Sequence, residues 1–167
     1  MEAIAAAAGV TKPILYRGIG DREALVAALA ERFVDRINAV VEAAVVGASG
    51  PHEALRRFAS AYLGAVDTER NLYTFITSSP TGGRGDQALH LADRSVLQMA
   101  AQLGAQRQAQ GLDPAAATPW AYAIVGMMHI VTLWWMRDAT ISREDLAEHL
   151  ADLLWAGLRG EAPPIVP

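Results

Sequence analysis

The chain has 167 residues, of which 52% are hydrophobic and 19% are charged, and this composition suits a folded domain with or without a small appendage rather than a disordered chain. The formal net charge of −4 excludes a protein that binds nucleic acid through its whole surface, so any such contact must be local. The sequence has no cysteine, which excludes disulfides, thiolate metal sites and cysteine nucleophiles.

Apolar residues recur at helical spacing and never alternate with polar residues over the length of a strand, which predicts an all-α protein. Two short helices are expected first, over residues 2–8 and 11–17. Gly9 can adopt the positive φ that ends the first of them. Thr11 is placed to cap the second, and Pro13 fits its first turn, where a missing N–H group costs nothing.

Six longer helices are expected to follow. They run from 21 to about 46, 51 to about 66, 70–78, 87–110, 114 or 119 to about 138, and 143 to about 158. Asp21 is the expected cap of the first, and Ser142 with Asp145 resembles a capping box for the last. Glycine and proline make residues 78–86 the clearest loop.

Residues 115–136 carry no charge and are numerous enough to span a bilayer. Pro119, Gly126 and His129 interrupt this segment, and it has no basic flank. We interpret it as a helix buried on all sides, with a membrane span as the alternative. Since the first residues also lack the features of a signal peptide, the sequence predicts a cytoplasmic protein.

The first two helices have the form of a helix-turn-helix. That motif needs a small residue where its helices cross, which is Ala5 here. It also needs apolar residues after the turn and on the inner face of the second helix, and Val10, Ile14 and Leu15 occupy those positions. A helical pair with no role in DNA binding is the alternative, because a motif match is only a hypothesis.

The outward side chains of this motif predict the DNA contacts. Thr11 and Lys12 stand at the N-terminus of the second helix, which faces the major groove and favours a nearby phosphate. Tyr16 and Arg17 could reach the DNA backbone, and Arg22 opens the next helix on the same side. Residues 2–25 carry three basic and three acidic side chains, so any positive patch on this segment would be local.

The stretch IAAAAGVTKPILYRGIGDREALVAALAERF, from Ile4 to Phe33, resembles the N-terminal signature of the TetR (tetracycline repressor) family of bacterial transcriptional regulators. Residues 120–160 are similar, more weakly, to the C-terminal domain of many members. The resemblance implies a homodimer that reads a palindromic operator, with a DNA-binding head over residues 1–33 and a helical ligand-binding and dimerisation domain over 34–167. It also implies groove and phosphate contacts from Thr11, Lys12, Tyr16, Arg17 and Arg22.

Two departures from the family pattern affect the head. Gly18 and Ile19 stand where members have an aromatic residue or histidine followed by phenylalanine, so the hinge loses aromatic packing and gains backbone freedom. Met1 falls where the second helix of the family begins, which leaves an incomplete three-helix bundle. At roughly 25 cal/mol per Å² of apolar area, the lost cover costs several kcal/mol. We therefore expect the natural start to lie upstream, the alternative being a frayed head that binds DNA poorly.

Other chemistry has little support in the sequence. None of the histidines forms a metal-binding pair along a helix, and Glu148 with Asp152 predicts a solvated helix face rather than a metal site. The motifs of serine hydrolases, phosphate-binding loops and zinc proteases are absent. We expect no enzymatic activity, no metal and no cofactor.

The effector site is expected in the C-terminal domain, where aromatic and methionine side chains are core residues by default but some could line a cavity. The expected contacts are Tyr62, Phe75, Met99, Trp120, Met127, His129 and Trp134. His129 or Tyr62 would orient a lipophilic or aromatic molecule. The last two helices, rich in leucine and tryptophan, are the expected four-helix dimer interface.

The sequence thus predicts a homodimeric repressor that binds a double-stranded DNA operator and is released by a small molecule. One alternative is a helical ligand-binding dimer that no longer binds DNA. The other is a small helical enzyme or carrier.

Overall fold

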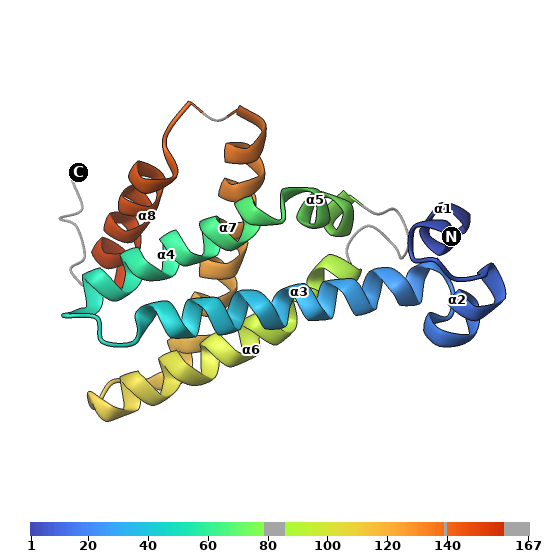
Figure 1. The fold of residues 1–167 in the computed structure, drawn as a ribbon. Helices are drawn as coiled ribbons and strands as arrows, with labels where there is room; N and C mark the ends of the chain where they lie inside the picture. Colours follow the sequence, from blue (N-terminus) through green and yellow to red (C-terminus); the bar gives the residue numbers. More distant parts are fainter. Residues whose placement is uncertain (79–85, 139, 159–167) are drawn as a thin grey trace.

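The structure of the chain, a computed structural model, describes residues 1–78, 86–138 and 140–158, with their side chains except over 78–92 (Figure 1). The described part holds α1 (Glu2–Ala7), α2 (Lys12–Ile19), α3 (Arg22–Val45), α4 (Pro51–Thr68), α5 (Arg70–Ser78), α6 (Asp86–Ala109), the 3₁₀ helix η1 (Pro114–Ala116), α7 (Ala117–Asp138) and α8 (Arg143–Leu158). These residues contain no strand, and the all-α prediction is confirmed. The predicted loop at 78–86 lies largely outside the described residues.

The turn between α1 and α2 follows the predicted glycine geometry. Gly9 has a φ of 65°, and its N–H group donates to the carbonyl of Ala6 at 3.2 Å. The N–H group of Val10 donates to the carbonyl of Ala5 at 3.0 Å, which completes a Schellman motif. Thr11 occupies the N-cap position of α2 but its side chain makes no capping hydrogen bond, so that prediction is wrong.

The other two predicted caps are confirmed. The carboxylate of Asp21 accepts a hydrogen bond from the N–H group of Ala24 at 2.9 Å, at the start of α3. At the start of α8, the hydroxyl of Ser142 accepts from the N–H group of Asp145 at 3.0 Å and donates to its carboxylate at 2.8 Å. Contrary to the prediction, α2 runs through Gly18 and ends at Ile19, followed by the C-cap residue Gly20, whose φ of 91° few other residues adopt.

The helices form a small head and a larger helical domain that share α3. Figure 1 shows α1 and α2 at the N-terminal end of α3, well apart from α4, α7 and α8. In the domain, α4 packs mainly on α3 and α8, and α6 packs mainly on α7. The predicted boundary after Phe33 falls inside α3, so one continuous helix joins the two parts, and the boundary itself stays a prediction.

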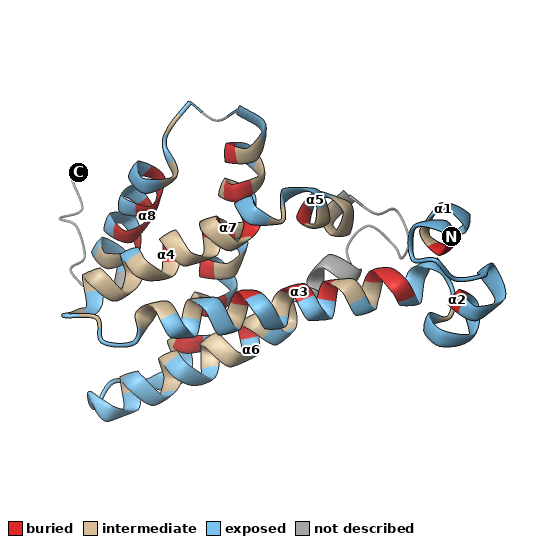
Figure 2. Ribbon diagram, viewed as in Figure 1, coloured by how far each residue is buried: buried red, intermediate tan, exposed pale blue. Residues whose placement is uncertain are grey.

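The core of the domain consists of two adjoining clusters. The first joins α4, α7 and α8 and is centred on residues such as Leu63 and Met128, which are almost fully buried. The second joins α3, α4 and α5 through Phe33, Val66 and Tyr73. Figure 2 shows how few buried positions the head has in comparison.

The apolar helix α7 is buried on one side only, which corrects the prediction of burial on all sides. It buries Met128, Thr132 and Trp135 against the domain, while Tyr122 and Ile130 are exposed. Residues 114–138, which include η1, are long and apolar enough to cross a membrane, but core helices of soluble proteins pass the same test.

The head packs less tightly than the sequence predicts. Ala5 and Leu15 are buried at the crossing of α1 and α2, as expected. Ile14 is exposed over 49% of its surface, so its predicted place on the inner face of α2 is wrong. Val10 and Ile19 also reach the surface.

Candidate functional site

The second helix of the head presents the predicted DNA contacts to solvent. Thr11, Lys12, Tyr16 and Arg17 are all exposed on α2. The Arg17 guanidinium donates a long hydrogen bond of 3.4 Å to the carbonyl of Pro13, which lays this side chain along its own helix. The N-terminus of α2 carries no side-chain cap, and of its first three residues only Lys12 has an N–H group open to an anion, because Pro13 has none and that of Ile14 donates to the carbonyl of Thr11 at 3.0 Å.

Arg22 joins the head to the domain. It is the exposed first residue of α3, and its guanidinium carbon lies 5.7 Å from the centre of the Phe75 ring on α5. This separation suits a cation–π contact. Phe75, a predicted effector contact, is therefore placed against the head.

Three polar side chains meet inside the domain. The Tyr73 hydroxyl of α5 lies 2.5 Å from Nδ1 of His129 on α7, and the Tyr62 hydroxyl of α4 lies 3.5 Å from that of Tyr73. Tyr62 and His129 were both predicted as effector contacts. Tyr73 is buried and connects them, so the group forms a chain through three helices.

Burial shifts the pKa values of these three side chains and so determines their protonation states. Removal from water raises the pKa of Tyr73 and of Tyr62 above the ordinary value of 10.0, so both phenols keep their protons. Burial lowers the pKa of His129 below 6.5, which favours the neutral ring. One hydrogen bond therefore joins the Tyr73 hydroxyl to Nδ1 of a neutral imidazole, and its direction depends on the tautomer of the His129 ring.

A further polar atom lies on the same helix. The Thr132 hydroxyl is fully buried and has no hydrogen-bond partner within the described part of the chain. Thr132 follows His129 by three residues, which places both on one face of α7. Since buried polar groups are normally satisfied, this hydroxyl could accept or donate to a molecule bound there. Met99 and Met127 pack against the adjoining core cluster and supply adaptable apolar surface.

The two predicted tryptophans lie elsewhere. Trp120 packs under Arg107, whose guanidinium carbon is 4.5 Å from the ring centre. Trp134 is 39% exposed, on the outer side of α7. The structure thus brings Tyr62 and His129 together, and it leaves Trp120 and Trp134 outside their group.

Tyr73 and Thr132 were missed as site residues in the sequence. An aromatic residue in an apolar helix is a core residue by default, and a threonine there gives no signal of its own. The contact between Tyr73 and His129 joins positions 56 residues apart, which no local spacing reveals.

The outer side of the domain carries an apolar surface. Tyr122, Ile130 and Trp134 on α7 and Leu153 on α8 expose between 39% and 64% of their surfaces. We refer to these four residues as the outer apolar face. Three of them lie along α7, eight and four positions apart, and large exposed apolar side chains are candidates for a site of association.

Comparisons with known proteins agree with this architecture. The family profile described as "Tetracyclin repressor-like, C-terminal domain" matches residues 40–163. The HTH-type transcriptional regulators MT0489 and Rv0472c, from two strains of Mycobacterium tuberculosis (CDC 1551 / Oshkosh and ATCC 25618 / H37Rv), are each 30% identical over 163 residues. These alignments cover 96% of this chain and 69% of the relative.

Solved structures share the fold. The TetR family transcriptional regulator PfmR from Thermus thermophilus superposes with a TM-score of 0.64 at 24% identity, over 97% of this chain and 88% of that one. The fatty acid degradation regulator FadR from Bacillus halodurans superposes with a TM-score of 0.67 at 22% identity, over 93% of this chain and 83% of that one. At these identities the likeness establishes the fold.

Proposed function

Because the chain belongs to the TetR family of transcriptional regulators, we propose that it is a homodimeric repressor whose α2 helix binds an operator and whose domain binds a lipophilic or aromatic effector. The exposed basic residues of α2, Lys12 in its first turn and Arg17 in its last, carry the proposal. Membership in a family of transcriptional regulators points to a soluble cytoplasmic regulator rather than an enzyme, and one apolar helix does not indicate a membrane protein. No comparison favours a dimer that has lost DNA binding.

The operator contacts divide by chemistry. Thr11 and Lys12 stand at the open N-terminus of α2, where a helix enters the major groove and its amide groups favour phosphate. Tyr16 and Arg17 lie farther along α2 and are suited to the DNA backbone, and Arg22 is proposed to contact it from the start of α3. These backbone contacts, with a phosphate contact from Lys12, would position the protein on the duplex, while Thr11 would contact base edges and give sequence preference.

An operator selected from random duplexes tests this assignment. Lys12→Ala should weaken binding to all duplexes to a similar degree and reduce the slope of log affinity against log salt by about 1. Arg94→Ala removes an exposed arginine of α6, far from α2, and is the matched control. Equal salt slopes for wild type and Lys12→Ala would refute the phosphate contact.

The effector is proposed to bind beside the Tyr62–Tyr73–His129 chain. The neutral histidine, two protonated phenols and the Thr132 hydroxyl offer hydrogen bonds without charge, and the surrounding methionines and aliphatic residues favour an apolar molecule. Helix α5 carries both Tyr73, which contacts His129, and Phe75, which contacts Arg22. A movement of α5 on effector binding would therefore act on the start of α3 and on the position of the head.

Nile red, a neutral, lipophilic and aromatic dye, is a suitable probe. Met127→Trp should fill the space beside the core cluster and weaken dye binding about tenfold or more, whereas Trp120→Phe, outside the cluster, should not. Because coupling is reciprocal, an operator duplex should weaken dye binding by the factor by which the dye weakens operator binding. Dye binding that Met127→Trp leaves unchanged would place the effector elsewhere.

The outer apolar face is proposed as the dimer interface. Helices α7 and α8 of two copies would form a four-helix arrangement that covers Ile130, Trp134 and Leu153. Ile130→Asp should convert the dimer to a monomer in analytical ultracentrifugation. Leu97→Asp, at an equally exposed leucine of α6, should leave the dimer intact. A dimer that persists in Ile130→Asp would refute this interface.

A further inference from the structure

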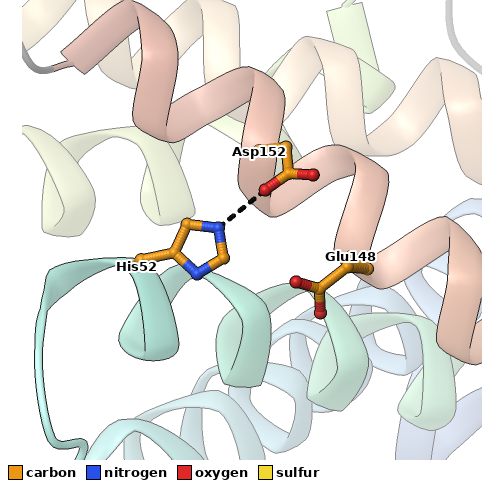
Figure 3. A group of neighbouring side chains, drawn as sticks. All are labelled: His52, Glu148 and Asp152. Carbon is orange, nitrogen blue, oxygen red and sulfur yellow. Dashed lines mark hydrogen bonds and ion pairs between the residues drawn. The ribbon is translucent and has the colours of Figure 1, made fainter.

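A histidine and two carboxylates from different helices meet at the surface of the domain, away from the head. His52 lies in the first turn of α4, and Glu148 and Asp152 lie one turn apart on α8 (Figure 3). One ligand atom from each of these residues lies within 4.8 Å of the other two. The Nε2 atom of His52 and Oδ1 of Asp152 are 2.8 Å apart.

The packing of two helices holds this group in place. Helices α4 and α8 form the most extensive contact in the domain, through buried residues such as Leu63 and Leu150. Pro51 begins α4 and fixes the backbone of the turn that carries His52. The imidazole ring meets Trp155 edge-on, with ring centres 6.4 Å apart. The positions of the three side chains are thus determined by rigid helices and not by a loop.

We propose that His52, Glu148 and Asp152 form a binding site for a divalent transition metal of the zinc class, which links α4 to α8. One imidazole and two carboxylates are suitable ligands for zinc, and three protein ligands leave a position for water. Two atoms that each bind one zinc ion at about 2.1 Å lie roughly 3–3.5 Å apart, close to the spacing of His52 and Asp152. The imidazole favours zinc, nickel or cobalt over magnesium and calcium, which prefer oxygen alone.

One cation competes for this site. The Nε atom of Arg56, one turn after His52, lies 3.9 Å from a carboxylate oxygen of Glu148. A bound metal would replace both this contact and the hydrogen bond between His52 and Asp152. All three ligands reach solvent, so an ion can enter without a change in the core. The sequence predicted a solvated face here because His52 is 100 residues from Asp152.

Zinc chloride and the untagged full chain, freed of metal by a chelator, test the proposal. Calorimetric titration should show one site per chain, and free zinc at 100 times the dissociation constant should raise the melting temperature by about 5–10 °C. Magnesium chloride at the same concentration should have no such effect. Equal stabilisation by magnesium, or none by zinc, would overturn the proposal.

Four variants locate the site. His52→Ala and Asp152→Asn should each weaken zinc binding at least about tenfold, because each removes one of three ligands. His149→Ala, which removes an exposed histidine beside Glu148, should bind zinc like the wild type. Arg56→Gln should bind zinc more tightly, since the competing charge is gone. Wild-type affinity in His52→Ala, or a loss in His149→Ala as large as in His52→Ala, would overturn the assignment.

Discussion

The head and the domain of this protein are built from the same kind of helix but are stabilised differently. Over residues 1–21 the structure buries only Ala5 and Leu15, and Ile14, Tyr16 and Ile19 are exposed. In the domain, helices α3 to α8 bury residues in two adjoining clusters, with Leu63, Val66 and Met128 almost inaccessible. The stability of the head therefore depends on the turn between α1 and α2 and on its junction with α3, whereas the stability of the domain depends on its buried core.

This difference suits two tasks. A surface that must lie in a DNA groove needs outward side chains on a short helix. In α2 this leaves only Leu15 buried. A domain that binds an apolar molecule and a second copy of itself needs a stable frame. We therefore expect substitutions in the core to lower the stability of the whole protein and substitutions in the head to change only the local stability of α1 and α2.

The largest effect is expected for Leu63→Ala. Leu63 is fully buried on α4 within the first cluster, and its truncation should lower the free energy of unfolding by about 2–5 kcal/mol. Leu97→Ala, at a leucine with 68% of its surface exposed, should change it by less than about 0.5 kcal/mol. Urea denaturation followed by circular dichroism measures both. Similar losses in the two variants would show that burial on α4 does not set the stability of the domain.

Tyr73→Phe comes next. This substitution keeps the ring but removes the hydroxyl that hydrogen-bonds to Nδ1 of His129, which leaves a half-buried ring nitrogen without this partner. The expected cost is about 1–3 kcal/mol in the free energy of unfolding. Tyr122→Phe removes an exposed hydroxyl that bonds Asp93 at 3.3 Å, and its cost in the same denaturation experiment should be near zero. If both substitutions lowered the free energy of unfolding equally, the hydrogen bond between Tyr73 and His129 would contribute no more to stability than an exposed one.

A pair of glycine substitutions tests the head alone. Gly9→Ala places a side chain at a φ of 65°, with nothing within 4 Å of the added carbon, so the cost is that of the backbone, about 1 kcal/mol. Gly18→Ala lies inside α2 in open space and should stabilise that helix by about 1 kcal/mol. Hydrogen exchange of the α1 and α2 amides should move in opposite directions in the two variants. A change in the melting temperature of the domain would contradict the independence of the two parts.

The smallest effect is expected from pH. Burial lowers the pKa of His129 in the folded protein below 6.5, so the unfolded chain takes up this proton first as the pH falls. The stability contributed by the neutral ring is complete above about pH 6.5 and decreases below it. His129→Gln removes the titrating group, so its free energy of unfolding should fall less than that of the wild type between pH 7 and pH 5. An equal fall in the free energy of unfolding of the two proteins over this pH range would show that folding does not lower the pKa of His129.

Local sequence was sufficient for the helices and for several of their ends. The Schellman turn at Gly9, the carboxylate cap of Asp21 and the Ser142–Asp145 box each depend on residues within a few positions of one another. The Thr11 cap failed because a suitable residue at the N-cap does not guarantee a side-chain hydrogen bond. The continuation of α2 through Gly18 to Ile19 differs from the prediction because a glycine inside a helix costs only about 1 kcal/mol, which neighbouring packing can offset.

The sequence alone determined that this protein is a bundle of helices with a glycine-linked pair at its start, because periodicity and turn chemistry act over short distances. Only the tertiary structure decided which faces are covered. It exposed Ile14 and Trp134, and it joined Tyr73 to His129 and His52 to Asp152. Such pairings depend on how whole helices pack, and the energy that selects one packing is spread over the entire core.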